Sequence, residues 1–144
     1  MPDGSRLLRV VIDTNVLFSA VAFPQDSPPS RVLDLARTGR IEAFVSGFIL
    51  KELEKNLFRK AGWDAERIST LRKKLKGFLW VIEPASRVRG VAGKEDDDRI
   101  LECALDAKAE ALVTGSMKHI RVLGEFQGVR ILTPREFLDR YFPA

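Results

Sequence analysis

The sequence predicts an α/β fold in which a central parallel sheet of about five strands is flanked by helices on both faces. The main observation is that short apolar runs alternate with longer segments whose apolar residues recur at helical spacing. A second observation is the first run, residues 7–12, which is rich in β-branched residues and is interrupted only by Arg9. Such a run is typical of a strand in the middle of a sheet. Strands that alternate with helices form a parallel sheet covered on both faces.

The composition is that of one ordinary soluble domain. A chain of 144 residues can bury a sizeable core, and its hydrophobic and charged fractions are 45% and 31%. We expect a single domain over residues 1–144, with a flexible N-terminus at residues 1–6. No apolar stretch is long enough to span a bilayer and the first residues do not resemble a secretory signal, so we expect a cytoplasmic protein without membrane contacts. The single cysteine, Cys103, excludes an intramolecular disulfide and a multi-cysteine metal site.

The first third of the chain continues with two helices and a strand. After the first strand, the apolar residues 16–23 predict a helix, and the proline-rich stretch 24–29 predicts a loop. Residues 30–38 have helical spacing and end before Gly39, a natural helix terminator. A second short strand is expected at residues 41–45.

Two further helices and a third strand make up the middle of the chain. Ser46 is expected to cap one helix and Asp64 the next, because each precedes a segment with apolar residues at helical spacing. These apolar positions are Ile49, Leu50, Leu53 and Leu57 in the first helix, and Ile68, Leu71, Leu75 and Phe78 in the second. Residues 80–82 predict the third strand, which ends before Pro84.

The last part of the chain completes the alternation. Residues 87–94 are expected to be a loop, and the acidic triplet 96–98 to open a helix through Ala107, since acids in a first turn favour the helix dipole. Residues 111–114 and 129–132 predict the fourth and fifth strands. A capping box with proline at the first helical position follows in residues 133–136 and predicts the start of the last helix.

Basic residues are concentrated between Arg59 and Arg89, where aromatic residues are interleaved with them, in a chain of net charge +4. Basic side chains neutralise phosphates, and aromatic rings stack on unpaired bases. The candidate nucleic-acid contacts in this stretch are Arg72, Lys73, Lys74 and Lys76. A solvated helix face with its aromatic rings turned to the core would give the same pattern, and for the aromatic residues that interpretation is the better one.

Three separated segments supply carboxylates that could meet at one edge of the sheet. Asp13 follows the first strand, at the position where open α/β folds place their ligands. Glu52 lies in the helix after Ser46, and the acidic triplet 96–98 lies at a helix start. Mg²⁺ and Mn²⁺ prefer oxygen ligands, and a bound ion can activate a water and stabilise charge on a phosphate. A structural alternative stays open for each: a helix cap for Asp13, a solvated surface position for Glu52, and a favourable dipole for the triplet.

In the order and joint presence of its motifs, the chain resembles a PIN domain, of the branch described as toxins of type II toxin–antitoxin systems. The motifs are residues 10–17, Ser46 with Glu52, residues 96–104, residues 113–115 with Lys118 and His119, and residues 131–138. Each is weak alone, but together they cover nearly the whole chain. The resemblance implies a Mg²⁺- or Mn²⁺-dependent ribonuclease with a parallel sheet, RNA as its substrate, an antitoxin protein as a partner and assembly as a homodimer.

The resemblance also implies roles for individual residues. Asp13, Glu52 and Asp97 match the metal-binding, catalytic acids, and Asp98 and Asp96 are possible further participants. The supporting positions that match are Asn15, Thr114 and Ser116.

One position departs from the family pattern. Many PIN domains have a fourth acid directly after the Thr-Gly step, where this chain has Ser116. Fewer carboxylates weaken the binding of a second metal ion, so we expect one dominant ion, held by Asp13 and Asp97. Of the residues that follow, Lys118 is a candidate phosphate contact, and His119 is expected to be a local hydrogen-bonding residue rather than a general base.

Two functions stay open on the sequence alone. The first is a metal-dependent endoribonuclease in which Asp13, Glu52 and Asp97 hold the ion and a metal-activated water attacks the phosphodiester. The second is a PIN-fold module that binds RNA or protein with weak or no nuclease activity, because the fourth acidic position is Ser116.

Overall fold

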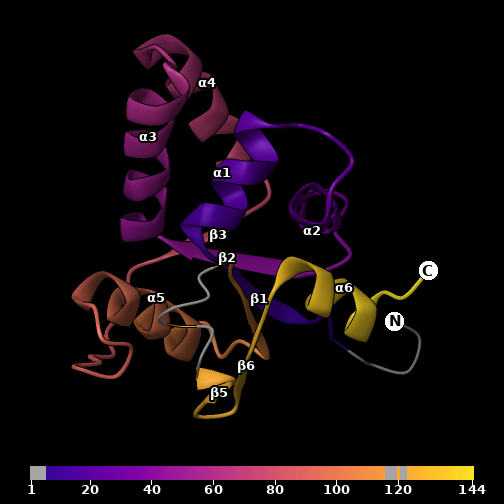
Figure 1. Ribbon diagram of the computed structural model, residues 1–144, viewed down its shortest axis with the longest axis vertical. Helices are drawn as coiled ribbons and strands as arrows, with labels where there is room; N and C mark the ends of the chain where they lie inside the picture. The colour runs from indigo at the N-terminus through magenta and orange to yellow at the C-terminus, as the bar shows by residue number, and fades with distance from the viewer. Residues whose placement is uncertain (1–5, 116–119, 121–122) are drawn as a thin grey trace.

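A sheet in the order β3-β2-β1-β4-β6-β5 runs through the structure, a computed structural model that describes residues 6–115, 120 and 123–144 (Figure 1). All neighbouring strands pair in parallel except β5 and β6, which are antiparallel. The strands are β1 (Arg9–Ile12), β2 (Glu42–Ser46), β3 (Trp80–Ile82), β4 (Ala111–Val113), β5 (Glu125–Phe126) and β6 (Val129–Leu132). The predicted parallel α/β sheet is therefore confirmed, with one antiparallel strand added at its edge.

The five predicted strands are all present, with small changes at their ends. The first strand begins at Arg9 rather than at residue 7, and the fourth ends at Val113 rather than at residue 114. The sequence did not predict β5, because two residues are too few to show a period of two. Arg9, which interrupts the first apolar run, places its guanidinium 4.4 Å from the centre of the Phe44 ring and donates from Nε to the Ala107 carbonyl at 2.7 Å.

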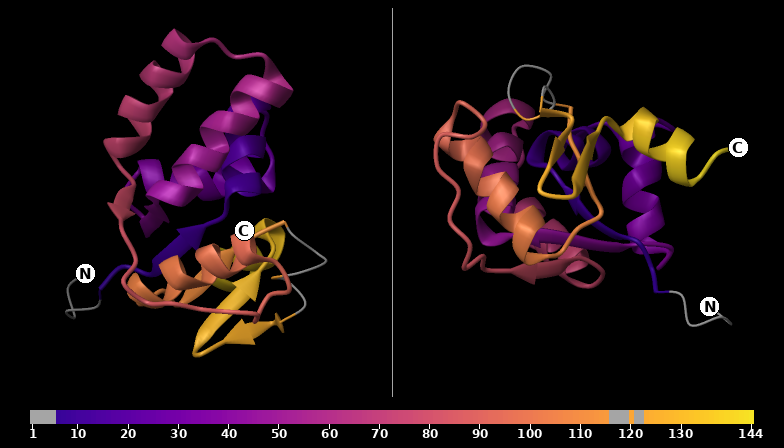
Figure 2. Two further views of the ribbon diagram at one scale, coloured as in Figure 1. Left: turned by 90° about the vertical axis from the view of Figure 1, so that its left-hand side faces the viewer. Right: turned by 90° about the horizontal axis from the view of Figure 1, so that it is seen from below.

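The helices lie on both faces of the sheet, as predicted. They are α1 (Thr14–Ala22), α2 (Pro28–Arg37), α3 (Gly47–Ala61), α4 (Ala65–Lys76), α5 (Glu95–Asp106) and α6 (Pro134–Tyr141). The two perpendicular views place α5 across the sheet from α1 and α3, and show α3 and α4 as a hairpin that projects from the rest of the domain (Figures 1 and 2). None of the described helices is long and apolar enough to cross a membrane.

The caps explain where the helices begin. Ser46 and Asp64 accept hydrogen bonds from the third backbone N–H of α3 and α4, as predicted, and Thr133 and Glu136 form the predicted capping box. One prediction was wrong: Pro28 and Pro29 are not loop residues but the first two residues of α2, capped by Ser27. Proline suits this place because the first helical N–H groups have no partner within the helix.

The sheet order creates a switch point next to β1. The chain leaves β1 toward β2 and β3 on one side, and returns through α5 to β4 on the other side of β1. Since the carboxyl ends of β1 and β4 are neighbours, with Ile12 opposite Val113, the residues that follow these strands meet at one point. Crevices at such points are where open α/β sheets bind ligands.

The buried apolar residues on the two faces of the sheet form one core around β1 and β4. In these strands Val10, Val11, Leu112 and Val113 are fully buried. Cys103 belongs to this core, and burial raises the pKa of its thiol to about 12. A thiol in that environment stays protonated and packs as a small apolar side chain.

Candidate functional site

Asp13 occupies the switch point directly after β1. Its backbone N–H donates to the Val113 carbonyl at 3.0 Å, which ties the end of β1 to β4. Its carboxylate is also the N-cap of α1 and accepts from the Thr14 N–H at 2.6 Å. The capping role and a ligand role thus fall on the same side chain, which is only 4% exposed.

A small network of side chains fixes the Asp13 carboxylate. The Thr114 hydroxyl, fully buried at the end of β4, donates to Asp13 Oδ2 at 2.7 Å. The Asn15 amide nitrogen lies 3.5 Å from the same oxygen, and the Asn15 Oδ1 accepts from the Gly115 N–H at 2.9 Å. Asn15 therefore bridges the ends of β1 and β4 and holds the carboxylate in one orientation.

Burial raises the pKa of Asp13 to about 6. Removal from water is the largest cause, and the negative charge of Asp97 adds to it, while the hydrogen bonds from Thr114 and from the Thr14 N–H act in the opposite direction. A carboxylate held out of water and beside a like charge is stabilised in its ionised form by a cation. This is the electrostatic condition expected of a metal ligand.

A cavity of about 250 Å³ opens over Asp13. Three of the predicted metal-binding acids, Asp13, Glu52 and Asp97, line it together with Asp96. They come from the end of β1, from α3 and from the first turn of α5, so segments far apart in the sequence converge as predicted. The full lining is Asp13, Thr14, Asn15, Phe48, Glu52, Asn56, Lys94, Asp96, Asp97 and Ile100.

The carboxylates share this cavity without being drawn together into a finished metal cluster. Among the described residues, no group of three or more His, Cys, Asp or Glu side chains is arranged to hold an ion. Glu52 in particular is half-buried, and its carboxylate lies 3.7 Å from the Lys55 ammonium one turn further along α3. The donor set is nevertheless the one that hard divalent cations prefer, because it consists of carboxylate and amide oxygens.

Asp98 does not line this cavity. Both of its oxygens accept backbone hydrogen bonds, from the Gly90 N–H at 2.8 Å and from the Ala92 N–H at 2.9 Å. Asp98 is buried and holds the connection between β3 and α5, residues 83–94, which we call the strap. Of the acidic triplet, the structure therefore brings Asp96 and Asp97 to the cavity and turns Asp98 to the strap.

The strap is fastened to α5 along one helix face. Residues 98, 102 and 106 are spaced four apart, and their carboxylates face it in succession. Glu102 accepts from the Val88 N–H at 2.9 Å, and Asp106 from the N–H groups of Ala85 and Ser86. Arg99 joins them by donating to the Val88 carbonyl at 2.8 Å. Together these bonds set the path by which the chain reaches the start of α5.

The basic residues of α4 are divided between two roles. Arg72 donates twice to Glu54 of α3, at 2.6 and 2.7 Å, and this ion pair raises its pKa. The α4 lysines, by which we mean Lys73, Lys74 and Lys76, lie in the last turn of the helix and are exposed. They are the part of the predicted nucleic-acid contact that the structure leaves without an ion pair among the described residues.

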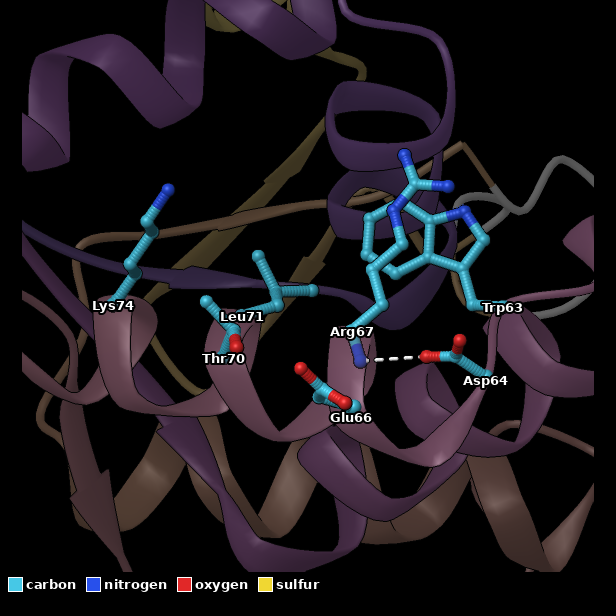
Figure 3. Close-up of a pocket in the computed structure, with 7 residues that line it drawn as sticks. All are labelled: Trp63, Asp64, Glu66, Arg67, Thr70, Leu71 and Lys74. Carbon is cyan, nitrogen blue, oxygen red and sulfur yellow. Dashed lines mark hydrogen bonds between the residues drawn. The ribbon is translucent and has the colours of Figure 1, made fainter.

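Of the aromatic residues interleaved with the basic ones, Trp63 is turned to the core, as the alternative interpretation predicted, and is 9% exposed. For Trp80 that interpretation was wrong, because its side chain is 58% exposed. The guanidinium of Arg67 covers the Trp63 ring at 3.7 Å from the ring centre (Figure 3). Leu71 and Lys74 continue the same side of α4 and, with these residues, line a shallow groove. The stacked arginine occupies the indole face that a base would need.

Two polar residues of the cavity, Asn56 and Lys94, were not predicted from the sequence. Asn56 follows Glu52 by four residues, so helical spacing could have placed it on the same face. Lys94 is the N-cap residue of α5, directly before the acidic first turn, and only the fold shows that its side chain borders the cavity. The predicted site residues Ser116 and Lys118, as well as His119, lie outside the described residues.

A parallel α/β sheet whose switch point carries a buried aspartate, with further acids from two helices, is the architecture of the PIN domain. The PIN domain family model matches residues 9–118, and the chain belongs to this family. Proteins of the family are generally nucleases that use divalent metal ions.

The chain is 29% identical, over 145 aligned residues, to the uncharacterized protein MJ1680 of Methanocaldococcus jannaschii, with 93% of this chain and 92% of that protein covered. Among solved structures, it is similar in fold to a chain of VapBC-1 from nontypeable Haemophilus influenzae, with a TM-score of 0.64, 17% identity and coverage of 89% and 99% of the two chains. It is also similar to a chain of VapBC2 from Rickettsia felis bound to a promoter DNA fragment, with a TM-score of 0.61, 17% identity and coverage of 86% and 97%. A third is the sarcin-ricin loop cleaving toxin VapC20 of Mycobacterium tuberculosis, with a TM-score of 0.55, 12% identity and coverage of 84% and 98%.

Proposed function

We propose that this chain is a metal-dependent endoribonuclease that hydrolyses RNA phosphodiester bonds, and the toxin of a toxin–antitoxin pair. The observation that carries the proposal is the convergence of Asp13, Glu52, Asp96 and Asp97 on one cavity at the switch point of a PIN domain. Clustered carboxylates are costly in a protein unless a cation offsets their charge. A site of this kind is therefore best explained by the ion that it binds.

Asp13 and Asp97 would hold a Mg²⁺ or Mn²⁺ ion, with Glu52 as a third ligand. When bound, such an ion supplies an activated water and stabilises the charge that develops on the phosphate. Asp13 is positioned for this before the ion arrives, because the Thr114 hydroxyl and the Thr14 N–H fix its two oxygens. Glu52, whose carboxylate lies 3.7 Å from the Lys55 ammonium, would complete the set.

The protein around the acids has separate tasks. Asn15 orients the Asp13 carboxylate and keeps the ends of β1 and β4 together. The buried wall under Asp13 excludes water from one side of the carboxylate, which strengthens its attraction to a cation. The α4 lysines would attract the RNA backbone electrostatically.

An antitoxin protein and a second copy of this chain are the further partners that we propose, in the cytoplasm, where RNA is available. The antitoxin is supported by the similarity in fold to chains of VapBC structures. Partners would cover exposed apolar side chains, and the largest of these among the described residues are Phe23, Phe58 and Trp80.

The alternative function is a PIN-fold module that binds RNA or protein without cutting. It is favoured by the pairing of Glu52 with Lys55, and by the described residues, in which no three acids are arranged to hold an ion. Against it stands the retention of four like charges around one cavity, for which binding alone gives no reason.

The two functions are separated by incubating the purified chain with a mixed single-stranded RNA pool in Mg²⁺, in Mn²⁺ and in excess chelator. The nuclease is expected to degrade RNA only with the metal. It should also leave no 2′,3′-cyclic phosphate ends, since a water and not the ribose hydroxyl attacks phosphorus. Binding of intact RNA without cleavage under all three conditions would favour the alternative.

A further inference from the structure

The cavity that holds the acids is rich in acceptors and poor in donors. A phosphodiester carries a negative charge, and it enters a space lined by four carboxylates. One divalent ion offsets two of these charges. Hydrogen-bond donors on the cavity wall are therefore needed if the phosphate is to be held there.

Apart from the acids themselves, four side chains of the described lining can donate hydrogen bonds. Two are already engaged, since the Thr14 hydroxyl donates to the Ile49 carbonyl at 3.3 Å and the Asn15 amide faces Asp13. The other two are the Asn56 amide and the Lys94 ammonium. Neither forms a side-chain hydrogen bond or an ion pair with any residue that the structure describes.

The backbone of Lys94 is held in place although its side chain is exposed. Lys94 ends the strap, whose Gly90 and Ala92 N–H groups are bound by Asp98. Its own carbonyl accepts from the Asp98 N–H at 3.1 Å. Helix α5 thus carries Asp97 in its first turn, while its Asp98 fixes the backbone of the strap from which the Lys94 side chain borders the same cavity.

Asn56 reaches the cavity from a different helix. It lies one turn after Glu52 on α3 and is half-buried, so its amide is restricted more than that of a surface residue. Lys94 and Asn56 thus line the same cavity from the end of the strap and from α3, and an anion between them would be contacted from two elements.

We propose that Lys94 and Asn56 are the phosphate-binding pair of this site, which donate hydrogen bonds to the non-bridging oxygens of the RNA phosphodiester. This inference rests on the proposed function, because it names the groups that hold the substrate in that same cavity. Lys94 would attract the phosphate by its positive charge, whereas Asn56 is neutral and would orient the phosphate by a directional hydrogen bond. Their effects on RNA binding should therefore differ in salt dependence.

The test is RNA binding measured by fluorescence anisotropy, with a fluorescein-labelled single-stranded RNA oligonucleotide and the full chain in an Asp13→Asn background that does not cleave. Adding Lys94→Ala is expected to weaken binding about tenfold and to make the negative slope of log affinity against log salt shallower by about 0.7. Adding Asn56→Ala is expected to weaken binding by about fivefold without changing the slope. Lys94→Arg should retain the slope of the background.

The matched control is Lys60→Ala, which removes an exposed lysine of α3 outside the cavity lining. Thermal unfolding followed by circular dichroism checks that every variant is folded, which is expected because Lys94 and Lys60 are both exposed. The proposal is overturned if Lys94→Ala binds RNA with the affinity and slope of Lys60→Ala. It is also overturned if Lys94→Ala leaves RNA binding unchanged in that background and, in the chain that keeps Asp13, only tightens Mn²⁺ binding, since Lys94 would then be a countercharge to the acids.

Failure of this inference and failure of the proposed function give different results. If the native chain degrades RNA and the background variant binds the oligonucleotide, but Lys94 and Asn56 have no effect, only the phosphate-binding pair is wrong. If the native chain does not degrade RNA and the background variant does not bind it, both the nuclease function and the phosphate-binding pair are wrong.

Discussion

Replacing Asp13 by Asn should stabilise the metal-free protein while it removes the proposed activity. The native carboxylate is buried and its pKa is raised from 3.8 to about 6. A raised carboxyl pKa means that the folded state binds the proton more tightly than the unfolded state does. Folding therefore becomes less favourable as the pH rises from about 4 to about 6, and the cost is fully present above that window.

The size of the effect follows from the shift. A change of about two pKa units corresponds to about 3 kcal/mol, at about 1.4 kcal/mol for each unit. Asn carries no charge and can still accept one hydrogen bond, so Asp13→Asn should recover up to about 3 kcal/mol at pH 8 and almost nothing at pH 4. For a domain of this length the gain at pH 8 is roughly 6–12 °C in the midpoint of thermal unfolding.

Urea unfolding of both proteins in excess chelator, at several values between pH 4 and pH 8, measures this difference. Asp139→Asn, which removes an exposed carboxylate of α6, is the matched control and should not reproduce the pH-dependent gain. Two results would contradict this prediction: Asp13→Asn is no more stable than the native chain at pH 8, or the difference in stability between them is the same at pH 4 and pH 8. Either result would mean that Asp13 is not destabilised by burial.

Three further predictions concern the surroundings of the cavity. Thr114→Val removes the hydrogen bond that favours the ionised Asp13 and so raises the pKa of Asp13 further. The acid limb of the pH–activity profile should therefore move up by about one pH unit. An unchanged limb would show that this hydrogen bond does not affect the ionisation on which the reaction depends. Asp98→Asn leaves one acceptor for two strap N–H groups and should cost about 1–3 kcal/mol in urea unfolding, with faster hydrogen exchange in the strap; slow exchange there would contradict the fastening role. In excess chelator, where the native chain does not cleave, replacing the three α4 lysines by Ala should reduce the magnitude of the salt slope of RNA binding by about 2. Arg72→Ala should reduce it less, because the Arg72 side chain is bound to Glu54. Equal slopes for the lysine variant and the native chain would exclude this surface.

The sequence was sufficient for the sheet and for Asp13. The run that ends at Asp13 is buried on both faces, and a residue that follows a central parallel strand can point only to the carboxyl edge. Glu52 and Asp97 were found because helical spacing and the family motif placed them, and the cavity contains both. These residues could be predicted because the ends of strands and the starts of helices are marked by local patterns in the sequence.

Other features depend on contacts that no local pattern records. The acidic triplet 96–98 is continuous in sequence, but adjacent residues of a helix point about 100° apart, so that Asp97 faces the cavity and Asp98 the strap. Only the fold shows which of these directions leads to the cavity. Lys94 reads as an ordinary loop residue until the path of the strap is known. The antiparallel β5 forms a short hairpin with β6, in which Glu125 is opposite Arg130, and its two residues are too few to show a period of two in the sequence.

The central claim, that Asp13 anchors a metal-dependent nuclease, is tested most directly by titrating Mn²⁺ into RNA cleavage reactions of the native chain, Asp13→Asn and Asp139→Asn, purified in parallel. We expect saturable cleavage by the native chain and by Asp139→Asn, abolished by chelator, and a rate at least about 100-fold lower for Asp13→Asn. Equal cleavage by the native chain and Asp13→Asn would contradict the central claim, because the activity would then come from a contaminant or from a site that does not include Asp13.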